Sequence, residues 1–141
     1  MFAHPHCPCT RASLGELNAV MAMCGSKVEI YIFFTKPSGF SDSWVKSDLW
    51  RSAASLPGVH VIQDDEGKTA EVFHATTSGQ VLLYDKGGAL IFNGGITGSR
   101  GHAGDNQGRQ SVISLLLGEP VRKHRTSVYG CSLFAKEVLS S

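Results

Sequence analysis

Two cysteines separated by a single proline, Cys7 and Cys9, are the residues of this sequence whose types and spacing could do chemistry. Pro8 suits the first position of a helix, because proline has no N–H to lose there and its φ angle is already helical. This predicts that Cys7 is the N-cap of a helix, where free backbone N–H groups and the helix dipole stabilise a thiolate and lower the pKa of the thiol. We therefore predict a nucleophilic sulfur at Cys7.

The spacing of the pair also predicts its redox behaviour. A disulfide between Cys7 and Cys9 would close a smaller ring than the ordinary C-x-x-C motif does, with poor torsion angles, and such strain makes a disulfide easier to reduce. We therefore expect the reduced pair as the resting state, with Cys9 as a nearby second thiol. The alternative interpretation is that Cys9 is simply a small residue packed in a helical turn.

Two further cysteines stand alone. Cys24 lies 15 residues beyond Cys9 on the same predicted helix, which is about 22 Å away and outside disulfide range, so it is expected in the core. Cys131 is a candidate resolving thiol for Cys7 if the C-terminal tail folds back, and otherwise a packed or idle cysteine. The candidate modulators of Cys7 are four polar neighbours in the sequence and one histidine of a glycine-rich loop: His4, His6, Thr10, Arg11 and His102.

The elements that must position these residues alternate between helix and strand. Apolar residues at three- and four-residue intervals predict helices over residues 8–24, 43–56 and 105–117, the last with Asp105 as its N-cap, and a short helix is expected over 68–74. Runs rich in branched and aromatic residues predict strands over 28–35 and 59–62, and the segments 80–85 and 89–93 around a Lys-Gly-Gly turn predict a β-hairpin. This order indicates an α/β layer sandwich.

Composition narrows the classes of function. The 141 residues fit one domain over residues 1–118, followed by a tail at 119–141 that carries Cys131. A formal net charge of +1 gives no electrostatic reason to expect a nucleic-acid partner. No apolar run approaches the roughly 20 residues of a membrane helix, so no membrane segment is expected in this chain. The usual paired ligands of a structural zinc site are lacking, and we predict no cofactor.

The cysteine segment resembles the active-site signature of the thioredoxin-like superfamily, in particular membrane-anchored thioredoxin-like thiol–disulfide reductases and peroxiredoxin relatives. Residues 2–17 are similar to the F-W-A-x-W-C-P-x-C-R-x-x-x-P-x-L pattern of those proteins, residues 64–73 to D-x-x-G-x-x-A-x-x-F, and residues 81–88 to F-L-I-D-x-x-G. The resemblance covers residues 2 to about 95. It implies a three-layer α/β/α sandwich whose mixed sheet ends in a β-hairpin and a C-terminal helix, and it puts Cys7 at the position of the attacking cysteine.

The chain departs from this pattern in three places. Thr10 stands where the family has its second cysteine, which gives a C-P-C-T motif. Gly79 stands where the family has a cis-proline that grips extended substrates, so the resemblance implies Ser78, Gly79 and Pro8 as substrate-binding residues. Only three residues precede the active-site loop, so the central strand is expected to be truncated. If a signal peptide or anchor is missing with it, the protein is expected to be extracytoplasmic.

Three functions stand as hypotheses. In the first, a thiol–disulfide oxidoreductase of cell redox homeostasis, the Cys7 thiolate attacks a disulfide of a protein or small molecule, and Cys9 or a substrate thiol resolves the mixed disulfide. In the second, a metal-binding or copper-delivery protein, Cys7 and Cys9 hold a soft ion together with His6, or with His4 or Cys131 in its place. In the third, a peroxiredoxin-like peroxidase, Cys7 becomes a sulfenic acid. A non-catalytic interaction domain is the remaining alternative.

Overall fold

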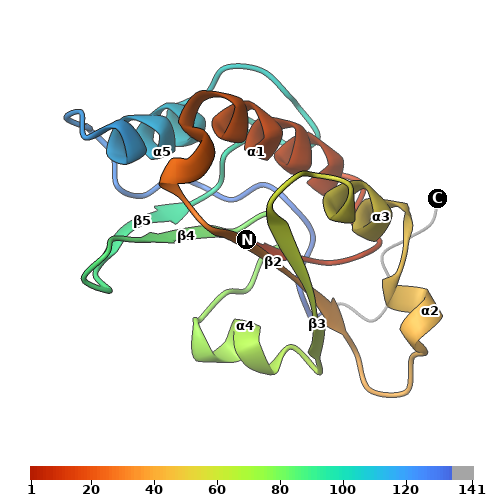
Figure 1. The fold of residues 1–141 in the computed structure, drawn as a ribbon. Helices are drawn as coiled ribbons and strands as arrows, with labels where there is room; N and C mark the ends of the chain where they lie inside the picture. The colour runs from red at the N-terminus through yellow and green to blue at the C-terminus, as the bar shows by residue number, and fades with distance from the viewer. Residues whose placement is uncertain (135–141) are drawn as a thin grey trace.

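The computed structural model describes residues 1–134, which form two small β-sheets with helices on both faces (Figure 1). The first sheet is parallel, and its strand order is β1 (Phe2–Ala3), β2 (Ile30–Lys36) and β3 (Val59–Asp65). The second is an antiparallel hairpin of β4 (Val81–Tyr84) and β5 (Leu90–Gly94). The helices are α1 (Thr10–Cys24), α2 (Asp42–Val45), α3 (Asp48–Ala54), α4 (Lys68–Val72) and α5 (Gln107–Leu117), with a 3-10 turn η1 (Gly25–Lys27) after α1.

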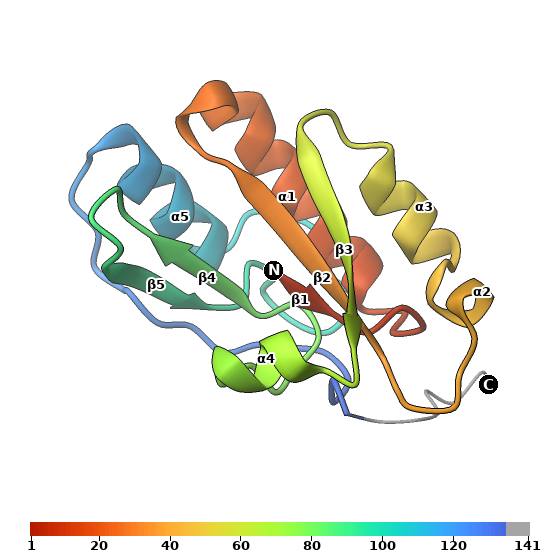
Figure 2. The same cartoon turned by 60° about the horizontal axis from the view of Figure 1, so that its bottom comes forward.

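The helices form two outer layers around the strands. Helices α1, α3 and α5 lie side by side over one face of the strands, and α4 lies on the opposite face (Figures 1 and 2). Each parallel step from β1 to β2 and from β2 to β3 crosses over through helices on the same face, as right-handed crossovers require. The predicted α/β sandwich with parallel strands, a β-hairpin and a C-terminal helix is therefore confirmed.

Helix α1 forms because apolar residues recur along one of its faces. Leu14, Leu17, Val20 and Cys24 are all buried in the main core, and the predicted core position of Cys24 is confirmed. The predicted start of the helix was wrong. The chain first makes two turns, in which Cys7 N–H donates to the His4 carbonyl and Thr10 N–H donates to the Cys7 carbonyl, so the N-cap is Cys9 and not Cys7.

Two other helix boundaries differ from prediction because of polar caps. The expected helix over residues 43–56 is divided into α2 and α3, since the hydroxyls of Ser41 and Ser47 each accept a backbone N–H and begin a separate helix. Helix α5 is capped by Asn106, whose side-chain oxygen accepts the N–H of Arg109 over 2.8 Å. Asp105, the expected cap, instead forms an ion pair with the Arg109 guanidinium.

β1 has only two residues and lies at the edge of the parallel sheet, between β2 and the hairpin. β1 pairs with β2 through Phe2 and Ala3 only, and Phe2 also bridges Gln80 just before β4. Beyond β1, the edges of β2 and β4 are separated by a groove of about 740 Å³. Its apolar lining comes from both sheets and from the helices behind them, and includes Leu17, Val20, Tyr31, Leu83, Val112 and Leu116.

The segment after α5 packs back across the domain. Asn93 N–H donates to the His124 carbonyl over 2.9 Å, and the Thr126 hydroxyl donates to the Gly95 carbonyl over 2.7 Å. The approach is so close that a Cβ on Gly94 would lie 2.3 Å from the Thr126 hydroxyl. This packing carries the end of the described chain to the carboxyl end of β1, where Cys7 lies. No helix in residues 1–134 has the length and apolar character needed to span a bilayer.

Candidate functional site

Cys7 lies at the end of β1, in the turn that leads into α1, and its side chain is 0% exposed. The turn is held by the loop before β4. The backbone N–H of His4 donates to the Ser78 hydroxyl over 2.8 Å, and that hydroxyl contacts the hydroxyl of Thr10 at 2.6 Å. Gly79 N–H donates to the Phe2 carbonyl over 2.8 Å. These contacts fix the backbone around the sulfur, and all of them come from residues far away in the sequence.

A four-residue segment of the tail, residues 130–133, covers the Cys7 sulfur, and we call it the tail strap. It runs antiparallel to residues 76–78, with Ser132 bridging Thr77. Ser78 N–H donates to the Cys131 carbonyl over 2.8 Å, and Leu133 N–H donates to the Thr76 carbonyl over 2.9 Å. Between these bonds, the N–H of Cys131 donates to the Cys7 sulfur over 3.3 Å.

The tail strap is anchored at both ends. At its start, a Cβ on Gly130 would lie 2.1 Å from the Ser78 carbonyl oxygen, so only glycine fits there. At its end, Leu133 is buried in a small apolar cluster with Phe2, Ala70 and Ala75, and its carbonyl accepts the hydroxyl of Thr35. The site residue Cys131 therefore lies on a segment that is packed against the domain, and not on a free end.

The surroundings of Cys7 favour its thiolate. Burial alone would raise the pKa of this thiol, but hydrogen bonds to its sulfur together outweigh burial and hold the pKa below its ordinary value. The larger of these bonds come from the thiol and the backbone N–H of Cys131, and smaller ones from the Thr10 hydroxyl and the N–H of Cys9. The predicted direction of the shift agrees with this environment, but the predicted main cause, the helix start, was wrong.

The pKa of the Cys131 thiol is shifted in the opposite direction to that of Cys7. Burial, its hydrogen bond to Cys7 and the negative charge of the Cys7 thiolate raise the pKa of the Cys131 thiol to about 11. Arg100 acts in the opposite direction, because its guanidinium lies 3.8 Å from the Cys131 sulfur and also donates to the Gly130 carbonyl over 3.3 Å. The negative charges of Cys9 and Cys131 in turn raise the pKa of Arg100. Three thiols and one guanidinium therefore share this site.

Not all residues predicted from the sequence meet there. Arg11 extends toward α3, where it donates to the Ser52 hydroxyl over 3.4 Å. The His6 ring contacts the Trp44 carbonyl at 2.7 Å, and Pro8 is exposed in the turn. His102 is exposed in the loop before α5, where its backbone N–H donates to the Ser99 carbonyl over 3.3 Å. His4 is buried beside Cys7 and its Nδ1 accepts the N–H of His6, so it supports the turn.

Arg100 is the residue that the sequence analysis missed. It lies in the glycine-rich loop of residues 98–104, and nothing in the local sequence indicates which direction its side chain takes. The one available signal was that it is the only Lys or Arg of this loop.

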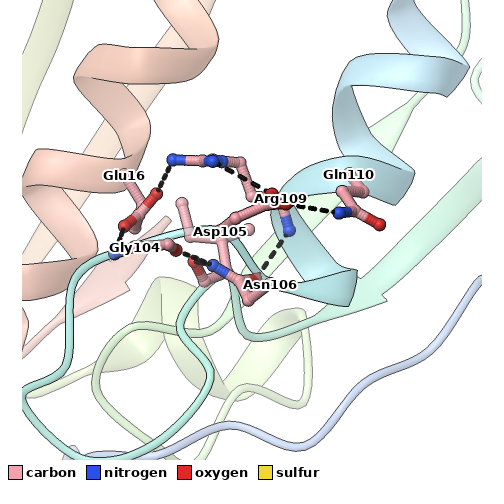
Figure 3. Close-up of polar contacts among 7 residues, drawn as sticks. Glu16, Gly104, Asp105, Asn106, Arg109 and Gln110 are labelled. Atoms are coloured by element: carbon pink, nitrogen blue, oxygen red, sulfur yellow. Dashed lines mark hydrogen bonds and ion pairs between the residues drawn. The ribbon is translucent and has the colours of Figure 1, made fainter.

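The other end of the same loop holds a buried carboxylate (Figure 3). Glu16 of α1 is 2% exposed, and its carboxylate accepts the N–H of Gly104 and pairs with the Arg109 guanidinium over 2.6 Å. Arg109 also pairs with Asp105 over 3.0 Å. The anion held by this loop and by α5 is therefore a side chain of the protein itself, which ties α1 to α5 and so fixes the helix that follows Cys7.

All four cysteines are free thiols in the structure. Among the described residues 1–134, no group of three His, Cys, Asp or Glu side chains is placed to hold a metal ion. The arrangement offers a thiolate, a neighbouring thiol and a cation, and this combination can carry out nucleophilic attack at sulfur.

Comparison with known proteins shows the fold alone. No protein-family model matches the chain, and no curated protein matches it. An uncharacterised conserved protein from Geobacillus kaustophilus superposes with a TM-score of 0.71 at 21% identity, over 99% of this chain and 77% of the other. A hypothetical protein from Sinorhizobium meliloti 1021 superposes with a TM-score of 0.62 at 21% identity, over 94% of this chain and 76% of the other. The fold is thus shared with solved proteins of bacteria.

Proposed function

We propose that the protein is a thiol–disulfide oxidoreductase of the thioredoxin-like type, with Cys7 as the attacking thiolate. The observation that carries the proposal is the hydrogen bond of 3.3 Å from the Cys131 N–H to the Cys7 sulfur. A sulfur that accepts a backbone N–H and further donors is stabilised as an anion, and the thiolate is the reactive form in exchange. The resemblance of residues 2–17 to the thioredoxin-like signature supports the same activity.

The reaction begins with attack of the Cys7 thiolate on one sulfur of a substrate disulfide. The bond between the substrate sulfurs breaks, a mixed disulfide forms at Cys7, and the other substrate sulfur leaves as a thiolate that takes a proton from water. A second thiol then attacks the mixed disulfide and releases the remaining substrate half. The proposed partners are disulfides and thiols of proteins or small molecules.

Reduction of a defined disulfide tests this proposal. Reduced protein freed of excess reductant is mixed with hydroxyethyl disulfide or insulin, and the released thiols are counted. We expect Cys7→Ser to slow the release strongly, because hydrogen bonds hold the pKa of Cys7 below its ordinary value, whereas burial raises the pKa of Cys131. Cys24→Ser is the matched control, since Cys24 is buried in the core and lies outside the site. Release by Cys7→Ser at the wild-type rate would refute the proposal.

The two other hypotheses have less support from the geometry. For a copper site, no group of three His, Cys, Asp or Glu side chains among the described residues is placed to hold a metal ion, and the His6 ring contacts the Trp44 carbonyl. Stoichiometric Cu(I) bound by the reduced protein would favour the metal hypothesis nonetheless. Peroxide consumption by the reduced protein would favour the peroxidase, and it would leave a sulfenic acid that dimedone traps at Cys7.

A further inference from the structure

We propose that Cys131, and not Cys9, is the thiol that resolves the mixed disulfide at Cys7, and that the tail strap is the segment that brings it there. This inference rests on the proposed function, since it assigns the second step of the same reaction. The structure brings the Cys131 N–H and thiol to the Cys7 sulfur across 124 positions of sequence.

The direction of the strap explains why Cys131 is the residue presented. Successive side chains of an extended segment point to opposite sides. In the strap, Cys131 and Leu133 face inward, toward Cys7 and the small apolar cluster, whereas Ser132 between them is exposed. The backbone bonds to Thr76 and Ser78 fix this alternation, so no other strap residue can take the place of Cys131.

Cys9 is poorly placed for the same role. It is the N-cap of α1 with φ −66° and ψ −23°, and only Pro8 separates it from Cys7. A bond between the two sulfurs would have to close a strained ring across the proline. In the structure, the contact made by Cys9 to the Cys7 sulfur is its backbone N–H, which stabilises the thiolate. Cys9 therefore helps Cys7 to attack, but its side chain is not arranged to release the product.

The charges around the two thiols determine the order in which Cys7 and Cys131 react. While Cys7 is an anion, burial, the hydrogen bond to Cys7 and the Cys7 charge together hold the pKa of Cys131 above its ordinary value. When Cys7 has reacted, its sulfur belongs to a neutral disulfide, so the last two of these causes disappear. Arg100 remains beside Cys131 and favours its thiolate. The reaction of Cys7 thus lowers the pKa of Cys131 and makes it a better nucleophile for the second step.

In the second step, the Cys131 sulfur replaces the substrate half that is bound to Cys7. The Cys131 thiol loses its proton to water, its sulfur attacks the Cys7 sulfur, and the bond from Cys7 to the substrate breaks. The released substrate thiolate takes up a proton. Over both steps the protein dithiol is oxidised to a Cys7–Cys131 disulfide, and one substrate disulfide is reduced to two thiols. An external dithiol of the cell must return the two electrons for another cycle.

The burial of Cys7 adds a requirement. Because Cys7 is 0% exposed under the strap, a substrate sulfur reaches it only when residues 130–133 leave the loop at residues 76–78. The strap therefore opens for the first step and returns for the second. It excludes a second substrate while the product is released.

Peptide mapping of the oxidised protein tests the assignment without any variant. Reduced protein is treated with one equivalent of hydroxyethyl disulfide, alkylated, and cleaved with trypsin under non-reducing conditions. Cleavage after Arg11, Arg125 and Lys136 places Cys7 and Cys9 in residues 1–11 and Cys131 in residues 126–136. We expect these two peptides to be joined, in the wild type and in Cys9→Ser. A disulfide closed within residues 1–11 would overturn the proposal.

Counting released thiols gives an independent result. Wild type and Cys9→Ser should release about two substrate thiols per chain, whereas Cys131→Ser should release about one and keep the mixed disulfide. Adding Ser132→Cys to Cys131→Ser restores the number of thiols but points the new one outward, so release should stay at about one. Release of two thiols by Cys131→Ser would refute the role of Cys131. Release of one thiol by Cys131→Ser, and its loss in Cys7→Ser, keep the two proposals separable.

The variant Arg100→Gln tests whether the charge of Arg100 promotes the second step. It should slow the second step more than the first and move the pH dependence of the second step to higher pH. Arg100→Lys should restore part of the wild-type profile, because it restores the positive charge. An Arg100→Gln protein whose second step has the wild-type pH profile would contradict this part of the inference.

Discussion

Replacement of Gly130 by alanine should open the site without removing any side chain around Cys7. The new Cβ would lie 2.1 Å from the Ser78 carbonyl oxygen and 3.1 Å from its carbonyl carbon. Both are backbone atoms, so the contact cannot be relieved by a side-chain rotation. We expect the tail strap to move away from residues 76–78 and Cys7 to become accessible.

The size of the effect follows from the bonds that the strap makes. Three of its hydrogen bonds are donated by backbone N–H groups and hold it at Thr76, at Ser78 and on the Cys7 sulfur. At about 1 kcal/mol each, their loss favours the open strap by about 3 kcal/mol, which is about a hundredfold in the open population. Where opening limits the reaction, alkylation of Cys7 should accelerate by a similar factor.

The pH dependence of alkylation provides the sharper test. The same strap supplies the larger hydrogen bonds that lower the pKa of Cys7, so its departure should raise that pKa toward the ordinary value of a thiol. At alkaline pH, where Cys7 is ionised in both proteins, Gly130→Ala should show the full acceleration. At lower pH the gain should shrink, since less of the variant is thiolate.

Iodoacetamide kinetics on the reduced proteins, read by mass spectrometry of residues 1–11, measure both effects. Gly15→Ala is the matched control, because Gly15 lies on α1 and a Cβ there meets no atom within 4 Å. The control should react as the wild type does. If Gly130→Ala reacts no faster at alkaline pH, the strap does not limit access to Cys7, and our interpretation of its burial is wrong.

Three further predictions concern stability. Glu16→Gln should lower the free energy of urea unfolding by about 1–3 kcal/mol, since it leaves the Arg109 guanidinium without its buried carboxylate. Asp105→Asn, at an exposed carboxylate, should lower it by less than about 1 kcal/mol. Equal losses in the two variants would contradict the role of Glu16. Asn106→Ala should cost about 1 kcal/mol through loss of the α5 cap, seen as a lower urea midpoint, and an unchanged midpoint would speak against that cap. Reduced wild type should lose stability relative to Cys131→Ser as the pH rises from 9.0 to about 11. Folding raises the pKa of Cys131, so over this range the folded protein keeps a proton that the unfolded chain gives up. Parallel curves of unfolding free energy against pH for the two proteins would contradict this linkage.

The elements of the fold could be predicted because their signals are local. The apolar spacing from Leu14 to Cys24 indicates one buried face of a helix, and a Lys-Gly-Gly turn between two apolar segments indicates a hairpin. The helix boundaries were less predictable, because they depend on which polar side chain turns back to the backbone. Asn106 and Asp105 are both good caps, and the ion pair of Asp105 with Arg109 leaves the cap to Asn106.

The site was only half predictable for the same reason. Cys7, the proposed nucleophile, could be singled out from its own neighbours, but its strongest hydrogen bonds come from Cys131, far along the chain. Whether the tail packs on the domain depends on close backbone approaches at Gly94 and Gly130, and a glycine in a sequence does not tell which atoms approach it. Arg100 was missed because loop geometry alone directs its side chain.

The 124 positions between Cys7 and Cys131 mean that a bond between them would turn almost the entire polypeptide into a ring. A ring of this size restricts the denatured ensemble, and the loop-entropy estimate for such closure is on the order of 5 kcal/mol. The redox state of this cysteine pair could then be measured from the melting temperature of the whole domain. Each turnover would switch the protein between a linear and a nearly cyclic chain, and a thermal-shift measurement could follow its redox poise without any reporter dye attached to the thiols.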